Sequence, residues 1–336
     1  MDNSNSLTGP IYIGGLSYSG KTQLRLMLDS HPDLSLTRRT YMWPKFYGRF
    51  GDLRNEENLA RCLDAMLASP GIRQLEPGRE RIEREFRAGP SPSPSQGERD
   101  ARLSPRPFQG EGDAGPSPSP SQGEGDEMAY GRLFALFHRH HAERRGKRRW
   151  GDQLGHVEQY ADPIFAAQPD ARMIHMVRDP RDRYAVVAGR GRARPGKLGW
   201  ETMAWRRSAE LGLRHSRRYA GRYLLVRYED LLAETERVLG EVCAFLGERC
   251  YPEMVPGTAA SPLDETIWGS PTPVLSSRQT RDTIPRYVES QVGAEMEALG
   301  YEAAAGATIR PRRLRHWMDE PFNRAGALAW QLFAND

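Results

Sequence analysis

The sequence predicts an α/β fold in which helices cover both faces of a central parallel sheet. Short apolar runs of four to six residues alternate along the chain with longer segments of helical periodicity. A glycine-rich turn, Gly15–Thr22, joins the first apolar run to the first helical segment. Low-complexity sequence is confined to one internal stretch, so the residues on either side of it can share a single core.

Each expected strand has apolar residues at neighbouring positions, which is typical of strands buried on both faces. The expected strands are 11–14, 149–152, 172–177 and 223–226. The expected helices have apolar residues at helical spacing, and several end at breakers such as His31-Pro32, Gly247 and Gly300. These helices are 22–30, 56–69, 72–87, 128–145, 156–167, 180–189, 200–219, 231–246 and 288–299.

Composition restricts the class of protein. The 336 residues are 38% hydrophobic and 27% charged, which excludes a fibrous chain and a wholly disordered one. A net charge of +4 favours an anionic ligand and gives no basis for expecting a nucleic-acid partner. The three cysteines, Cys62, Cys243 and Cys250, are too scattered for a disulfide framework or a metal site. With no signal-like N-terminus and no apolar run near the about 20 residues of a membrane span, a cytoplasmic protein is expected.

One internal stretch has a composition that cannot bury a core. The decamer GPSPSPSQGE occurs at 89–98 and again at 115–124. We expect 88–127 to be a disordered insertion in a surface loop, with a Pro-rich ligand for a partner as the alternative. The expected parts of the chain are a flexible N-terminus (1–9), an α/β domain containing the insertion (10–305) and a C-terminal basic, amphipathic segment (306–336). The last segment either packs on the domain or touches a partner or a membrane surface.

The turn Gly15–Thr22 satisfies the pattern G-x-x-x-x-G-K-[ST], between an expected strand and an expected helix. Its glycines let backbone N–H groups converge on phosphate oxygens, and the helix N-terminus adds partial positive charge. Lys21, one of four lysines in the chain, supplies a full charge, and Thr22 supplies a hydroxyl. The pattern predicts a phosphate-binding loop in a P-loop NTPase-like, three-layer domain; the alternative is an ordinary Gly/Ser turn.

Two further strands end in arginine. Arg178 follows the run 172–177, at the end of a strand where open α/β sheets bind ligands, and an arginine there can hold a phosphate with two hydrogen bonds. The alternative is a surface ion pair with Asp179 or Asp182. Arg227 opens a charged turn after 223–226, where acids at a helix start favour a structural role.

These pieces, in this order and spacing, resemble the sulfotransferase family over about residues 10–302. The resemblance rests on Gly14–Leu28 with His31-Pro32-Asp33-Leu34, Val177–Arg183, Arg227–Leu231 with Phe245-Leu246-Gly247, Ser277-Arg278 and Leu299–Glu302. It implies transfer of a sulfuryl group from 3′-phosphoadenosine 5′-phosphosulfate to the hydroxyl or amine of a small-molecule, glycan or peptide acceptor, without a metal.

The resemblance also implies roles for particular residues. The 5′-phosphosulfate would be held by Gly15, Ser17, Tyr18, Ser19, Gly20, Lys21, Thr22 and Gln23. Arg178 would hold the 3′-phosphate, with help from Arg278, and Lys21 would stabilise charge on the leaving phosphate. The segment Trp150–Gly155 resembles a family segment whose carboxylate, Asp152 here, would be the base. Candidates for the acceptor pocket are Trp43, Trp200, Trp205 and Trp268, with core packing as the alternative for each.

The chain departs from the family pattern at four positions. Tyr18 stands where the family often has Arg or Lys, and Lys21 where it has Thr. Val186 replaces a serine that binds the 3′-phosphate, and Gln153 replaces a lysine that neutralises the leaving group. Arginines that are close enough in sequence to compensate are Arg190, Arg192 and Arg194.

Two other functions remain open at this point. A nucleotide-dependent kinase or NTPase is suggested by the loop, but arginines lead both strand ends where a kinase favours a Mg²⁺-binding acid. A non-catalytic binding protein with the sulfotransferase fold is suggested by Val186 and Gln153, whereas the Lys21-Thr22 pair argues against it.

Overall fold

The structure is a computed structural model that describes residues 9–89, 123–192, 194–263, 267 and 278–302. Its centre is a parallel sheet of five strands in the order β2-β3-β1-β4-β5. The strands are β1 (Ile11–Gly14), β2 (Leu34–Arg38), β3 (Arg149–Gln153), β4 (Arg172–Val177) and β5 (Tyr223–Arg227). In the register, Ile11 lies between Gly151 of β3 and Arg172 of β4, so β1 is the central strand.

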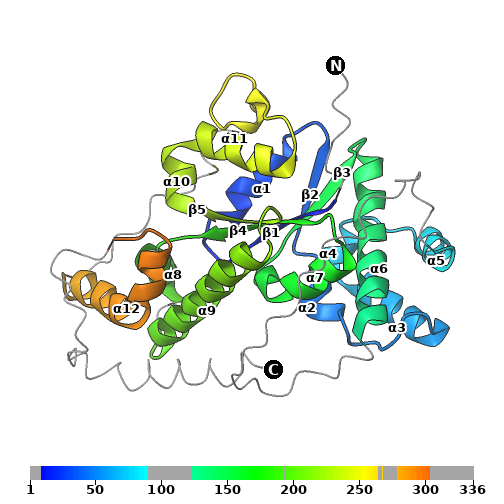
Figure 1. Cartoon of the computed structure of the whole chain (residues 1–336), viewed down its shortest axis with the longest axis horizontal. Helices are drawn as coiled ribbons and strands as arrows, with labels where there is room; N and C mark the ends of the chain where they lie inside the picture. Colours follow the sequence, from blue (N-terminus) through cyan, green and yellow to red (C-terminus); the bar gives the residue numbers. More distant parts are fainter. Residues whose placement is uncertain (1–8, 90–122, 193, 264–266, 268–277, 303–336) are drawn as a thin grey trace, which may run out of the picture.

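Helices cover both faces of the sheet, as predicted (Figure 1). One face carries α1 (Lys21–Asp29), α10 (Tyr228–Ala233) and α11 (Thr235–Leu246). The other face carries α6 (Gly123–Arg144), α7 (Ala161–Ala167) and α9 (Lys197–Arg218). The remaining helices on that side are α2 (Met42–Phe46), α3 (Glu56–Ala68), α4 (Pro70–Arg73), α5 (Arg79–Arg87), α8 (Pro180–Val187) and α12 (Arg278–Ala298). Short helical turns are η1 (Val157–Tyr160), η2 (Ala188–Arg192) and η3 (Pro252–Met254).

The core lies on both sides of β1. Ile11 and Ile13 pack in one apolar cluster with Leu24 and Leu28 of α1. Tyr12 points the opposite way, into a second cluster that contains residues of α2, α3, α5, α6 and α7. Successive side chains of a strand alternate between faces, so a strand covered on both sides needs apolar residues at neighbouring positions. The three-layer arrangement explains why IYIG reads as a continuous apolar run.

Several elements differ from the expectation: α2 was not predicted, and the helices expected at 156–167 and 231–246 are each divided in two, as η1 with α7 and as α10 with α11. β2 was not predicted because Ser35 and Thr37 interrupt its apolar residues; both are buried, and Thr37 Oγ1 donates to the carbonyl oxygen of Gly151 over 3.1 Å. The helix expected at 72–87 is two helices, α4 and α5, separated by a turn that includes Pro77 and Gly78. The helix expected at 288–299 begins earlier, at Arg278, and passes through Pro285.

Other expectations fall mainly outside the described residues. Residues 90–122 of the expected insertion lie there, as do residues 1–8 and the C-terminal segment 306–336. Within the described ranges, no helix combines the length and the hydropathy needed to cross a bilayer.

Candidate active site

The candidate site lies at the carboxyl ends of β1, β3 and β4. The chain leaves β1 at Gly14, turns through residues 15–20 and enters α1 at Lys21. β3 and β4 flank β1 on opposite sides, so their carboxyl ends meet this turn. Ligands of open α/β sheets bind at such a position, where successive connections leave the sheet on different sides.

Two glycines allow the turn to pack tightly against its surroundings. Gly15 has φ of 111°, and a Cβ there would lie 2.2 Å from the carbonyl oxygen of Met176 in β4. Gly20 has φ of 89°, and a Cβ there would lie 2.3 Å from the ring of Tyr228. Ser19 closes the turn from within, since its backbone N–H and its hydroxyl both donate to the carbonyl oxygen of Leu16, over 3.3 and 2.8 Å. A larger residue at 15 would collide with the backbone of β4, one at 20 would collide with the Tyr228 side chain of α10, and both positions have a positive φ that favours glycine.

Lys21 is buried at the start of α1, with 7% of its surface exposed. Its ammonium donates to the carbonyl oxygen of Gly15 and, over 3.0 Å, to that of Leu16. Burial lowers the pKa of Lys21 to about 8, although the negative charge of Glu158 opposes this effect. The lysine is therefore held at the loop and titrates close to neutral pH.

The other predicted loop residues differ in their exposure and in the direction of their side chains. Ser17 and Thr22 are exposed residues of the loop. Tyr18 is half-buried and has φ of 68°, a left-handed conformation that a loop around an anion commonly uses. Gln23 points elsewhere, since its amide donates to the carbonyl oxygen of Ile267 over 3.0 Å.

Arg178, at the end of β4, contacts this same loop. Its Nη1 donates to the carbonyl oxygen of Tyr18 over 3.2 Å, and its guanidinium lies 4.5 Å from the centre of the Tyr228 ring. Trp205 Nε1 donates to the backbone carbonyl oxygen of Arg178 over 2.8 Å and fixes the end of the strand. The structure thus brings Arg178 and the glycine-rich loop together across 160 residues of sequence.

The remaining 3′-phosphate candidates are less defined. Arg278 is the first residue of α12, and its side chain lies outside the described residues. Val186 is buried in α8 and presents no hydroxyl. Of the three nearby arginines, Arg190 lies 5.1 Å from the centre of the Tyr18 ring.

A pocket of about 260 Å³ opens beside the loop, between it and helices α8 and α9. Its polar lining includes Ser17, Tyr18, His156, Arg183, Arg192 and Glu201, and Trp200 forms part of its apolar wall. Arg183 is pinned in place because its Nε donates to the carbonyl oxygen of Ser17 over 3.0 Å and its Nη2 pairs with Glu201. Of the other tryptophans, Trp43 and Trp205 are core residues, and Trp268 lies outside the described residues.

His156 is a functional candidate that the sequence reasoning missed. It follows the end of β3 by three residues, has φ of 60° and lines the pocket beside Ser17. The residue is exposed at the pocket, and partial removal of water by its neighbours lowers its pKa, as do the charges of Lys21 and Arg183; the charges of Glu158 and Glu201 act in the opposite direction. A neutral imidazole in this pocket can accept a proton. Its position in the sequence could have indicated this role, because His156 comes shortly after the strand expected at 149–152.

Asp152, the predicted base, faces a different neighbourhood. It is 1% exposed, and its carboxylate accepts hydrogen bonds from Thr37 Oγ1, over 2.9 Å, and from Thr40 Oγ1. His138 of α6 lies 3.6 Å from the same carboxylate. Burial raises the pKa of Asp152 to about 7, although the two threonine hydroxyls oppose the shift. The residues that line the pocket do not include Asp152.

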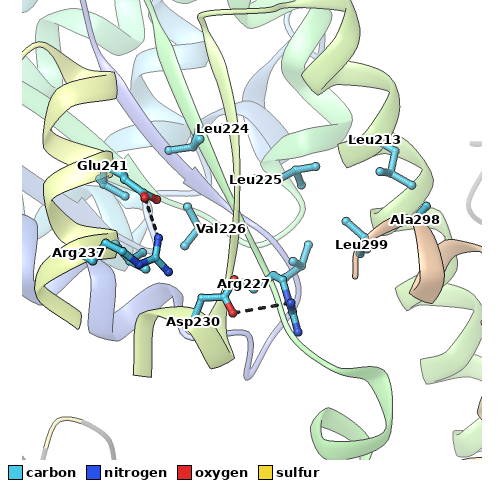
Figure 2. A pocket seen from close by; sticks show the side chains of 13 residues that line it. Leu213, Leu224, Leu225, Val226, Arg227, Asp230, Arg237, Glu241, Ala298 and Leu299 are labelled. Carbon is cyan, nitrogen blue, oxygen red and sulfur yellow. Dashed lines mark hydrogen bonds and ion pairs between the residues drawn. The ribbon is translucent and has the colours of Figure 1, made fainter. Parts of the chain in front are cut away.

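A second pocket, of about 280 Å³, runs along β5 at the edge of the sheet (Figure 2). Leu224, Leu225 and Val226 of β5 line it, and each of its two arginines forms an ion pair with an acid that also lines it. Arg227 pairs with Asp230 at 3.7 Å, and Arg237 pairs with Glu241 at 2.7 Å. None of the predicted site residues lines this groove, so the loop and Arg178 define the candidate site. Across the residues described, no three His, Cys, Asp or Glu side chains are grouped so as to hold a metal ion.

Comparison with solved structures finds sulfotransferase domains. The sulfotransferase domain of the Synechococcus PCC 7002 olefin synthase is 21% identical, with a TM-score of 0.50, over 88% of this chain and 95% of its own. The sulfotransferase domain of the curacin biosynthetic pathway is 18% identical, with a TM-score of 0.49, over 88% and 99%. A sulfotransferase from Alicyclobacillus acidocaldarius is 14% identical, with a TM-score of 0.41, over 88% and 96%.

At such identities, the likeness to the olefin synthase domain shows a common fold. No protein of curated function matches the chain significantly. The sequence profile of the sulfotransferase family, however, matches residues 10–253, which include the loop, β3, Arg178 and the pocket. That match covers most of the 336 residues and agrees with the three-layer fold. The chain therefore belongs to the sulfotransferase family.

Proposed function

We propose that this sulfotransferase moves a sulfuryl group from 3′-phosphoadenosine 5′-phosphosulfate to the hydroxyl or amine of an acceptor. The observation that carries the proposal is the meeting of two predicted phosphate sites, where Arg178 Nη1 lies 3.2 Å from the carbonyl oxygen of Tyr18. Because this donor carries a phosphate on the 3′ position and a phosphosulfate on the 5′ position of one ribose, it needs two such sites close together. The family match supports the same class of reaction.

The loop fits the phosphosulfate end of this donor. Backbone N–H groups at the start of α1, the hydroxyls of the exposed residues Ser17 and Thr22, and Lys21 supply positive or donor groups at one place. The residues proposed to contact the donor are Gly15, Ser17, Tyr18, Ser19, Gly20, Lys21, Thr22 and Gln23; Gln23 would contribute only its backbone N–H, because its side chain binds Ile267, and Gly15 would contribute close approach of the backbone, because its N–H binds Glu158. Arg178 and Arg278 are proposed for the 3′-phosphate. Helix N-termini and lysine ammonium groups both stabilise phosphate oxygens.

Lys21 is the proposed electrostatic catalyst. During transfer the acceptor oxygen or nitrogen bonds to sulfur, the bond from sulfur to the bridging oxygen breaks, and its electron pair stays on the 5′-phosphate. A fixed cation beside that oxygen stabilises the transition state more than the ground state. Two carbonyl oxygens of the loop hold the Lys21 ammonium beside the backbone that is proposed to bind the donor.

The acceptor proton needs a base. His156 is the better-placed candidate because it lines the pocket next to the loop, whereas Asp152 is 1% exposed and is bound by two threonines. We therefore propose that His156 accepts the proton, and we retain Asp152 as the alternative that the sequence suggests. The pocket beside Trp200 would hold a small molecule, or the end of a glycan or a peptide.

A cytoplasmic location is proposed on the basis of the cysteines. Cys62, Cys243 and Cys250 are free thiols, and the first two are buried. Thiols kept reduced are typical of a cytoplasmic protein.

The experiment is a transfer assay with sulfur-labelled donor and a panel of phenols, amines, sugars and peptides. The expected result is a labelled acceptor together with an equal amount of 3′-phosphoadenosine 5′-phosphate. A parallel reaction with γ-labelled ATP and Mg²⁺ tests the kinase alternative. Label transfer from ATP alone would refute the proposal. Tight binding of the donor without transfer to any acceptor would favour the non-catalytic alternative.

A further inference from the structure

A buried acid lies directly behind the phosphate loop. Glu158, in η1, is fully buried, and its Oε2 accepts a hydrogen bond from the backbone N–H of Gly15 over 3.1 Å. The neighbouring Gly14 makes this approach possible, because a Cβ there would lie 2.8 Å from Val157 and 3.2 Å from Glu158 Oε2. An acid at this place is unexpected, since the loop is proposed to bind an anion.

Glu158 and Lys21 hold opposite ends of the same residue. The carboxylate of Glu158 accepts a hydrogen bond from the N–H of Gly15, and the ammonium of Lys21 donates one to the carbonyl oxygen of Gly15. The two charges therefore lie on either side of one glycine, both shielded from solvent. Opposite charges in a buried setting interact much more strongly than they would at the surface.

A chain of hydrogen bonds fixes the carboxylate from behind. The hydroxyl of Ser208 in α9 donates to Glu158 Oε1 over 2.8 Å. That hydroxyl has one proton, so His175 Nε2, 3.0 Å away, donates to Ser208. His175 Nδ1 then accepts from the hydroxyl of Tyr223, 2.7 Å away. Burial lowers the pKa of His175, so the neutral tautomer required by this chain is the stable one.

The charge of Glu158 is not needed for these hydrogen bonds. A neutral glutamine could accept from Gly15, whereas burying a carboxylate costs free energy unless a cation compensates it. Burial alone would raise the pKa of Glu158, but hydrogen bonds from its own backbone N–H and from Ser208 act in the opposite direction, and the pKa lies below its ordinary value. The acid is thus ionised at neutral pH, and its charge acts on the groups around it.

We propose that Glu158 is a positioning residue of the active site, which anchors Gly15 from behind and balances the charge of the Lys21 ammonium. The inference rests on the proposed function in one respect, that Lys21 must be charged to stabilise the leaving phosphate. The groups that face Lys21 are Glu158 of η1, Arg183 of α8 with its partner Glu201, His156, and His175 of β4. Arg183 lowers the pKa of Lys21 and Glu158 raises it. Without Glu158, the pKa of Lys21 would fall further below its ordinary value.

The direct test measures the titration of Lys21 without any ligand. The chain has only four lysines, so ¹³Cε-labelled lysine gives four NMR signals, and Lys21→Arg identifies the one that belongs to Lys21. In the wild type this signal should titrate near pH 8. In Glu158→Gln its midpoint should fall by about one pH unit or more, the size typical of a lost opposite charge nearby. An unchanged or higher midpoint would overturn the proposal.

Two matched variants separate charge from packing. Glu248→Gln neutralises another buried acid, paired with Arg149 at 3.0 Å at the opposite end of the sheet, and should leave the Lys21 midpoint unchanged. Ser208→Ala removes a hydrogen bond from Glu158 but keeps the charge, so it should shift the midpoint much less than Glu158→Gln. A shift of equal size in Glu248→Gln would contradict the proposal.

Binding supplies a second readout. Glu158→Gln should bind 3′-phosphoadenosine 5′-phosphate as the wild type does at pH 6 and about tenfold more weakly at pH 8, because Lys21 is then uncharged. Lys21→Arg in the same background should restore the affinity at pH 8, since a guanidinium remains protonated. If the bisphosphate binds no variant and not the wild type either, the proposed function fails, while the NMR titration still decides the role of Glu158.

If Glu158→Gln alone does not fold, the double variant Lys21→Met/Glu158→Gln gives the answer. Removing both charges should restore a cooperative unfolding transition, because neither charge is then left buried without its partner. A double variant that remains unfolded would show that Glu158 serves packing instead, and would contradict the proposal.

Discussion

Lys21 follows the strand β1, whereas Asp152 lies within the neighbouring strand β3, and both are buried ionisable groups whose pKa is displaced toward neutrality. Lys21 contacts the backbone of the phosphate loop. Asp152 instead contacts the hydroxyls of Thr37 and Thr40 and lies near His138 of α6. The difference follows from where each residue stands. Lys21 begins the helix after β1, at the end of the sheet, while Asp152 lies within β3 and points to one face. Burial and a displaced pKa thus do not distinguish a group beside the loop from one buried in another layer; the direction of the side chain does.

The largest effect is expected at Lys21. Lys21→Ala should lower kcat by about 10²–10³-fold, because it removes a fixed donor at the leaving oxygen. Binding of 3′-phosphoadenosine 5′-phosphate should weaken much less, since the loop backbone and Arg178 remain. Steady-state kinetics measures kcat, and calorimetry measures the affinity for the bisphosphate. Equal losses in turnover and affinity would make Lys21 a ground-state anchor only. Lys21→Arg should recover part of the rate.

The next largest effect is expected at the base. Here the kcat of a His156 variant is compared with that of an Asp152 variant. His156→Gln should lower kcat by about 10²-fold or more, as expected when a general base is lost. Asp152→Asn should change kcat by less than His156→Gln does, because its carboxylate lies outside the pocket. Both variants should bind the bisphosphate like the wild type. The opposite order of rates would return the role of base to Asp152.

A smaller effect concerns stability and pH. Asp152 has a folded-state pKa raised to about 7 from its ordinary 3.8, so the folded chain holds this proton more tightly than the unfolded chain. Its contribution to stability is therefore greatest below pH 4 and is lost as the pH rises to 7, at up to about 1.4 kcal/mol per pH unit. Urea unfolding of Asp152→Asn should lack this component. Parallel pH profiles of wild type and variant between pH 4 and 7 would contradict the assignment.

The contiguous parts of the candidate site are the parts that the sequence suggests. The loop Gly15–Thr22 and the strand end at Arg178 each lie within a short segment, so spacing alone could identify them. The three-layer α/β fold was predicted correctly from alternating apolar runs, and the structure confirms it. The missed strand, β2, buries serine and threonine, whose hydroxyls are satisfied by tertiary contacts that a local pattern does not contain.

The residues that the sequence did not predict act across long separations. Glu158 reaches Gly15 over 143 positions, and Arg183 reaches Ser17 over 166. Asp152 offers a different lesson. Trp150 and Asp152 are two residues apart on β3 and so share a face, and Trp150 packs in the cluster under α6. The alternation of side chains along a strand is therefore sufficient to assign Asp152 to that layer.

The most direct test of the account compares two ligands on two proteins. Calorimetry would measure the affinity of wild type and Arg178→Ala for 3′-phosphoadenosine 5′-phosphate and for adenosine 5′-phosphate. The wild type should prefer the bisphosphate by about tenfold or more, the value of one charge-assisted hydrogen bond. Arg178→Ala should lose that preference while it binds adenosine 5′-phosphate nearly as well as the wild type does. A wild type without the preference, or a variant that keeps it, would contradict the claim that the loop and Arg178 form one donor site.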